Sequence, residues 1–345
     1  MRHTQRVQYL LARNGTFIGL VLLIAVFALL NDRFLSLRNA EVIALQVAEL
    51  GIIAIPLALL VITGSVDLSV GSIASMAGII AASVMDDGGS ALLGVLAALA
   101  FGVAAGALNG GLVSYLRLNP IVVTLGFLAA WGGFALFLTD GATLAGLPDS
   151  FTQFGTLKIA GIPLQVYVLV LATAFGWWLL NRRPFGRRLY AVGGNERAAF
   201  LMGVRVTRVR FIMFVYVGVA AAFAGIMLMA KLQAAPPAVG SGIELSVLTV
   251  VLLGGVGFAG GTGRVSGVIA GLLFVGVLRN GLVVTGTSQF LQEVFVGLTL
   301  VIAVALDDTM KRFAQRSWNT TDAPTDGSRA PGAPASELAS TATRA

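Results

Sequence analysis

Long apolar runs separated by short polar stretches dominate this sequence. A helix needs about 20 apolar residues to cross a hydrocarbon core of about 30 Å. Charged residues make up only 11% of the chain, against about 25% in soluble domains, so they cannot coat a water-facing surface. We therefore expect an all-α, polytopic membrane bundle of about ten transmembrane segments, near 17–31, 42–62, 68–85, 91–115, 121–139, 163–181, 209–230, 245–257, 264–284 and 290–306.

Two of these segments, 68–85 and 245–257, are short and border glycine-rich stretches. Non-helical backbone at membrane depth is tolerated only where protein or a water-filled cavity covers it. The pattern favours broken or half-spanning helices at these two places, and whether either segment crosses the membrane fully stays open from the sequence alone.

The positions of the Lys and Arg residues predict the orientation of the segments. Cytoplasmic loops of membrane proteins are enriched in these residues. With the N-terminus in the cytoplasm, the inner stretches hold 18 of them and the outer stretches hold 4. An even number of spans then places both termini in the cytoplasm. The net charge of +7 therefore reflects topology rather than a nucleic-acid-binding surface.

The chain is expected to contain one membrane domain and two tails. Residues 1–16 form a cytoplasmic N-terminal tail, and no small-residue cleavage site follows the first apolar run, so that run is an uncleaved helix. Residues 17–310 form the transmembrane domain, in which 182–208 is the main cytoplasmic loop. Residues 311–345 form a cytoplasmic C-terminal tail, whose small and polar composition predicts disorder.

Several chemistries are excluded by missing residue types. The chain has no Cys and only one His, His3, so it lacks the residues for disulfides, thiol nucleophiles and His-based metal or catalytic sites. None of its three lysines follows a glycine, so there is no phosphate-binding loop with a Gly-Lys pair. We expect neither a metal site nor a cofactor in this chain, nor an enzyme activity of its own.

Two glycine repeats lie on helical faces. Glycines recur every four residues from Gly102 to Gly110 and again from Gly263 to Gly271. Small residues at this spacing let two helix backbones approach closely, which drives helix association in lipid. We expect these faces to pack within the chain rather than against a second copy.

The cytoplasmic stretch 185–204 contains a predicted short helix. Asn195 is a suitable N-cap, Glu196 in the first turn favours the helix dipole, and Gly203 suits the position after the last turn. The helix, about 196–202, is either a knob that docks into a groove of a partner or an ordinary capped surface helix. The residues assigned to the docking role are Gly193, Gly194, Asn195, Glu196, Arg197, Ala198, Ala199, Phe200 and Gly203.

Four stretches resemble motifs of one family. The stretch 185–204 resembles the EAA-type coupling loop of ATP-binding-cassette (ABC) importer permeases. Residues 63–72, TGSVDLSVGS, are similar to the TGGIDLSVGS motif of the ribose-type sugar permeases, with Ser65 and Val66 in place of Gly and Ile. The stretches LNPIVVTLG at 118–126 and LLGGVGFAGGTGR at 252–264 resemble two further motifs of that family, so the likeness runs from about 40 to 310.

This resemblance implies a function and a set of partners. It implies the permease subunit of an ABC importer in the bacterial inner membrane, which moves a monosaccharide or a similar small polyol by alternating access. The implied partners are a second permease copy or paralogue, two cytoplasmic ATPase subunits that hydrolyse the ATP, and an extracytoplasmic solute-binding protein. Autoinducer-2 cargo is possible within the same family.

Ionisable and amide side chains inside the bundle are candidates for the translocation path, because such groups are expensive in lipid. The candidates are Glu49, Asn109, Arg279 and Asn280, with Glu49 as the expected partner of Arg279. Asp67 and Ser69, which precede the short segment 68–85, are expected to cap its helix.

The alternative function is that of an ion-coupled secondary transporter. Such a protein needs a carboxylate inside the membrane to bind H⁺ or Na⁺, and Glu49 or Glu293 would have to serve. Uptake driven by an ion gradient without ATP would distinguish this function from that of an ABC permease.

Overall fold

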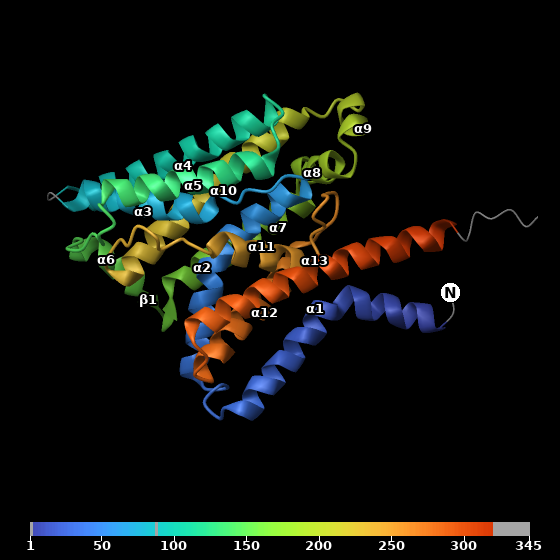
Figure 1. The fold of residues 1–345 in the computed structure, drawn as a ribbon, viewed down its shortest axis with the longest axis horizontal. Helices are drawn as coiled ribbons and strands as arrows, with labels where there is room; N and C mark the ends of the chain where they lie inside the picture. The colour runs from blue at the N-terminus through green and yellow to red at the C-terminus, as the bar shows by residue number, and fades with distance from the viewer. Residues whose placement is uncertain (1–2, 87–88, 320–345) are drawn as a thin grey trace, which may run out of the picture. The chain divides into compact units, whose positions relative to one another are not determined.

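The computed structural model describes residues 3–86 and 89–319, and residues 1–307 form one unit. Thirteen helices and one two-stranded hairpin are assigned in the described residues (Figure 1). The strands β1 (Lys158–Ile159) and β2 (Ile162–Pro163) pair antiparallel. The helices are α1 (His3–Leu30), α2 (Leu37–Ile62), α3 (Val70–Asp86), α4 (Ala91–Ser114), α5 (Pro120–Leu138), α6 (Asp149–Thr156), α7 (Leu164–Arg182), α8 (Pro184–Gly194), α9 (Glu196–Leu201), α10 (Val206–Leu232), α11 (Ile243–Leu253), α12 (Val265–Val284) and α13 (Gln289–Asn319).

Each of the ten predicted segments is helical, which confirms an all-α, multi-pass membrane bundle. Within the described residues, six helices are long and apolar enough to cross a membrane, namely α2, α4, α5, α7, α10 and α12. The other four apolar stretches are shorter, namely Gly15–Leu30 of α1, Val70–Asp86, Ile243–Leu253 and Gln289–Ala305 of α13. Helix α11, with 11 residues, rises only about 16 Å. Ten full crossings are therefore not confirmed, and the cytoplasmic termini stay a prediction.

The two predicted tails overlap helices. α1 begins at His3, inside the predicted tail 1–16, and α13 continues through Asn319, past position 310. The predicted disorder beyond residue 319 falls outside the described residues.

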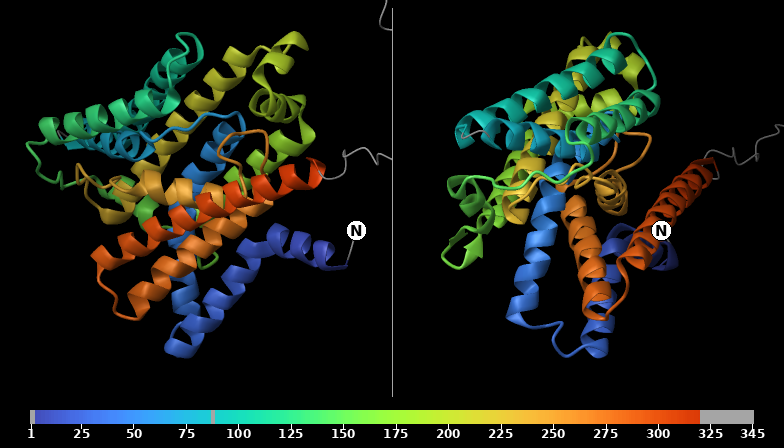
Figure 2. Two further views of the ribbon diagram at one scale, coloured as in Figure 1. Left: turned by 45° about the vertical axis from the view of Figure 1, so that its right-hand side comes forward. Right: turned by 60° about the vertical axis from the view of Figure 1, so that its left-hand side comes forward.

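The helix α2 is the best-buried long helix of the bundle. Its inner half, from Val47 to Ile62, is buried throughout except at Glu49. It contacts α7, α10, α11 and α12, and Figure 2 shows α2 and α12 running side by side. Because α2 ends at Ile62 among these helices, whatever packs at that end is connected to most of the core.

Glycine brings α4 against α10, as the repeat at Gly102–Gly110 predicts. A methyl group added at Gly106 would lie 2.5 Å from the carbonyl oxygen of Phe214 and 2.8 Å from the Cα of Val215. One added at Gly102 would lie 2.7 Å from the carbonyl oxygen of Gly218. These contacts confirm that the first repeat packs within the chain.

The second repeat also packs internally. Methyl groups added at Gly267 and Gly271 of α12 would overlap the carbonyl oxygens of Gly254 and Val250, at the end of α11. The short helix α11 is thus held against α12 by direct backbone contact, and the expectation of internal packing is confirmed for both repeats.

A non-helical segment runs through the interior between α2 and α3. Asp67 and Ser69 are completely buried there. Asp67 Oδ1 accepts hydrogen bonds from the Ser69 amide at 2.9 Å and the Ser69 hydroxyl at 2.6 Å, and Asn109 Nδ2 of α4 donates to Asp67 Oδ2 at 3.0 Å. The helix begins at Val70, and Asp67 forms a turn that precedes it rather than a cap on its first-turn amides.

We predict that Gly106→Ala destabilises the bundle by about 1–3 kcal/mol, because the added methyl group meets the α10 backbone, which cannot move freely. Gly111→Ala on the same helix is the matched control, since no neighbouring element of the described structure lies within 4 Å of its methyl group. The control should be neutral or stabilised by up to about 1 kcal/mol through helix propensity. Thermal unfolding in detergent measures both, and equal midpoints would contradict the packing argument.

Candidate functional site

The site centres on α9 and the helices on both sides of it. α8 begins at Pro184, whose fixed backbone angle suits the first helical position, and it buries Leu189 and Val192. Asn195 separates α8 from α9, and its Oδ1 accepts a hydrogen bond from the Ala198 amide at 2.9 Å. This geometry confirms the predicted N-cap.

The end of α9 also follows the predicted pattern. Gly203 has a φ of +79°, and its amide donates to the carbonyl of Phe200 at 2.9 Å, while the Val204 amide donates to that of Ala199 at 3.0 Å. The helix ends at Leu201, one residue before the predicted end. Glu196 in the first turn is bound by Arg210 of α10 at 3.0 Å, which ties α9 to the start of the next long helix.

Three consecutive apolar side chains at the end of α9 face solvent. Ala199 is the one buried residue of this helix, whereas Phe200, Leu201 and Met202 are 69%, 77% and 84% exposed. We call Phe200–Met202 the apolar knob. A contiguous exposed apolar group of this kind, presented on a capped helix, is typical of a surface that a partner covers.

The C-terminal end of α8 contacts the end of α2 and the α11–α12 loop. We call this contact the glycine junction, and it is formed by Ile62, Gly64, Gly193, Gly260 and Gly261. The Gly261 amide donates to the carbonyl of Ile62 at 2.8 Å. A methyl group added at Gly193 would overlap that same carbonyl, and one at Gly260 would lie 2.7 Å from the Gly64 amide nitrogen. Gly260 has a φ of +88°, which only glycine adopts easily. Three backbones therefore touch directly at this point.

A side-chain hydrogen bond reinforces the junction. The Tyr190 hydroxyl of α8 donates to the carbonyl of Gly263 at 2.8 Å. Burial raises the pKa of Tyr190, and Arg264 opposes that shift. The hydroxyl therefore stays protonated and remains a donor at neutral pH, which holds α8 to the α11–α12 loop.

Two of the predicted path residues, Asn109 and Asn280, are buried, and their side-chain amides form hydrogen bonds to other helices or loops. Asn109 is fully buried and bonds Asp67 and Ser69 at 3.0 and 2.8 Å. Asn280 is 1% exposed and exchanges two hydrogen bonds of 2.9 Å with Asn39 of α2. Both amides join helices to one another in this conformation.

The expected pairing of Glu49 with Arg279 is wrong. Glu49 binds Lys231, at the end of α10, at 2.6 Å. Arg279 donates to Ser246 of α11 at 2.7 Å and to Glu293 of α13 at 3.1 Å. The partners follow from the helix packing. Because α10 lies against α2, Lys231 reaches Glu49, and because α11 lies against α12, Ser246 reaches Arg279.

The four predicted path residues therefore belong to separate hydrogen-bond sets and do not converge on one site. Neither Lys231 nor Ser246 was predicted as a partner. Lys231 is one of the four basic residues of the predicted outer stretches, and Ser246 is a small polar residue without a motif around it. Among the described residues, no group of three or more His, Cys, Asp or Glu could hold a metal ion.

Comparisons with known proteins identify relatives over most of the chain. The family model described as branched-chain amino acid transport system / permease component matches residues 39–304. The ribose import permease of Bacillus subtilis strain 168 is 37% identical over 85% of this chain and 92% of its own. The D-allose transport system permease of Escherichia coli K12 is 33% identical over 86% and 91%.

A further relative is an autoinducer 2 import system permease of Photorhabdus laumondii, which is 33% identical over 88% of this chain and 92% of its own. No solved structure matches. These matches, together with the multi-pass helical fold, confirm the resemblance seen in the motifs. The chain belongs to the family of permease components of branched-chain amino acid transport systems and is the permease subunit of an ABC importer, a transport subunit rather than an enzyme.

Proposed function

We propose that this permease imports a monosaccharide or a similar small polyol across the bacterial inner membrane by alternating access. Its partners are a second permease copy or paralogue, two cytoplasmic ATPase subunits and an extracytoplasmic solute-binding protein. The relatives support the cargo class, since they are named as permeases for ribose, D-allose and autoinducer 2. An autoinducer-2-type solute is the alternative cargo within the same class of importer.

The apolar knob is the observation that carries the coupling role. Phe200, Leu201 and Met202 are exposed side by side, and the helix that presents them is fixed at both ends by its caps and by the Glu196–Arg210 ion pair. A rigid helix with exposed apolar anchors suits insertion into a groove of another protein. We assign that groove to the ATPase subunit.

The glycine junction is the route from the knob to the membrane helices. α8 follows α7 and leads into α9, so a force on α9 reaches the end of α8. There Gly193 touches the last turn of α2 and the α11–α12 loop through backbone atoms, which pack too closely to absorb the movement. ATP-driven closure of the ATPase subunits would thus displace α2 and α12 together. The two states differ in the contacts of α9, as a ligand-driven shift requires.

The ion-coupled alternative has less support. It requires a carboxylate inside the bundle that is available to bind an ion. Glu49 and Glu293, its two candidates, are ion-paired with Lys231 and Arg279. No observation in the described structure favours it over the ABC mechanism.

The docking role is tested by removing the apolar anchors. Phe200→Ser/Leu201→Ser/Met202→Ser should weaken binding of the ATPase subunit by about thirtyfold or more, because buried interface anchors carry most of the binding energy. Solute uptake with the full complement of partners should fall in parallel. Leu116→Ser, on another exposed apolar residue of the predicted inner face, is the control and should bind normally. Wild-type uptake by the triple variant would refute the docking role.

We predict that Gly193→Ala impairs transport while the ATPase subunit still binds. The methyl group cannot be accommodated against the Ile62 carbonyl, so α8 and α2 must separate and the route from α9 is interrupted. Gly194→Ala is the matched control, because its methyl group meets no atom within 4 Å apart from its chain neighbours and the nearby backbone of its own helix. ATP hydrolysis and uptake measured together in proteoliposomes distinguish the two variants. If Gly193→Ala kept the wild-type ratio of uptake to hydrolysis, the junction would not transmit the movement.

A further inference from the structure

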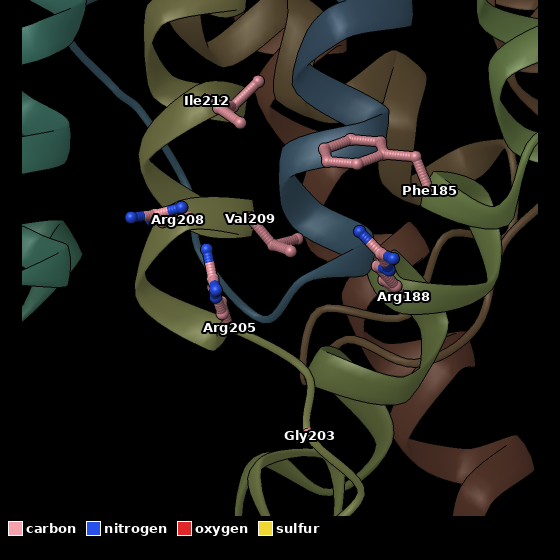
Figure 3. A pocket seen from close by; sticks show the side chains of 7 residues that line it. All are labelled: Phe185, Arg188, Gly203, Arg205, Arg208, Val209 and Ile212. Atoms are coloured by element: carbon pink, nitrogen blue, oxygen red, sulfur yellow. The ribbon is translucent and has the colours of Figure 1, made fainter.

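A cavity of about 440 Å³ opens between α8 and the first turns of α10, close to α9. Figure 3 shows side chains from α8 on one side and from α10 on the other, with Gly203 of the α9–α10 connection at its end. Its side-chain lining consists of three arginines and three apolar residues, Arg188, Arg205, Arg208, Phe185, Val209 and Ile212. The volume falls within the range of small-ligand sites, roughly 300–1,000 Å³.

The three arginines have no internal counter-charge. The side chains of Arg188, Arg205 and Arg208 form no hydrogen bond or ion pair within the part of the chain that the structure describes. By contrast, the adjacent Arg210 is neutralised by Glu196. Three guanidinium groups around one cavity repel one another, and their planar N–H groups match phosphate oxygens in pairs. The cavity is therefore electrostatically complementary to an anion with several oxygens.

The other half of the lining is apolar. Val209 is buried, Ile212 is 48% exposed, and Phe185 is half-buried on the opposite side. Figure 3 shows Phe185 and Ile212 facing the same space from α8 and α10. A free inorganic anion makes no favourable contact with these apolar side chains, whereas a ligand that joins an anionic group to a hydrocarbon chain contacts both the arginines and the apolar residues.

The neighbouring helix end indicates the depth of the cavity. Trp177 and Trp178 lie in the last turns of α7, and the guanidinium groups of Arg182 and Arg183 stack 5.5 and 4.2 Å from their ring centroids. Tryptophan at the end of a membrane span, capped by arginine, is typical of the headgroup level of a bilayer. Phe185 follows Arg183 by two residues, so the cavity begins at that level.

We propose that this cavity binds the phosphate of an anionic phospholipid headgroup from the cytoplasmic leaflet, with the start of an acyl chain along Phe185 and Ile212. Basic pockets on the cytoplasmic side of membrane proteins attract such lipids, and the leaflet carries a negative surface potential. The bound phosphate bridges α8 and α10, the two helices that precede and follow α9 in the chain. The lipid therefore helps to fix the position of α9. The observations behind this site are the lining of the cavity and its depth, and they do not depend on the docking role of α9.

The test is lipid retention by the purified full chain, measured by native mass spectrometry. Phosphatidylglycerol should be retained in preference to phosphatidylethanolamine. Arg188→Gln should weaken phosphatidylglycerol binding by about fivefold, as expected for one basic side chain near an anionic headgroup. Arg187→Gln is the matched control, because Arg187 is the exposed neighbour on the same helix and does not line the cavity. It should change binding by less than about twofold, since its charge lies outside the cavity.

Two further measurements decide between sources of the anion and between occupants. Arg205→Gln/Arg208→Gln, which leaves α8 intact, should weaken phosphatidylglycerol binding more than Arg188→Gln does, and inorganic phosphate at millimolar concentration should not displace the lipid. Displacement by inorganic phosphate would show a free-anion site and overturn the proposal. Equal losses for Arg187→Gln and Arg188→Gln would overturn it as well. So would unchanged lipid retention by the double variant accompanied by loss of the ATPase subunit, which would mark a protein-binding surface.

Discussion

Backbone contact through glycine is the constraint on which this structure depends. Helices in lipid gain little from apolar burial against one another, so they associate by close van der Waals packing. Gly106 lets the α4 backbone touch α10, and Gly267 does the same for α12 and α11. The glycine junction applies this packing to loops, where Gly193 lies against Ile62. Contacts between backbones transmit displacement better than contacts between flexible side chains, so the feature that holds the bundle together also connects its inner face to its core.

The interior segment between α2 and α3 links the junction to a buried polar network. Gly64 lies in the junction, and three residues later Asp67 is bound by Ser69 and Asn109. A backbone without helical hydrogen bonds survives at membrane depth only when protein covers it and partners satisfy it. Here the polar residues perform that structural task. Asn109 is buried in this network, so a translocation path through it would require a conformation in which the network opens.

The charges divide into paired and unpaired sets. Inside the bundle, Glu49 is paired with Lys231, and Arg279 is paired with Glu293. Each ion pair lowers the cost of holding a charge in lipid. At the predicted inner face, the arginines of the cavity between α8 and α10 have none among the described residues. Unpaired charge at a membrane surface is supported by water and lipid headgroups, whereas unpaired charge in the core is not. The positive-inside pattern that sets the orientation therefore also supplies the chemistry of a lipid site.

Local features were determined by the sequence itself. The Asn195 cap, the left-handed Gly203 and the ten apolar helices each depend on residues within a few positions, so residue type and spacing suffice. Long-range partners were decided only by the tertiary structure. Lys231 binds Glu49 across 182 positions, and Gly193 meets Ile62 and Gly260 from three separate segments. No residue pattern encodes such a meeting directly, because it depends on how all the helices between them pack.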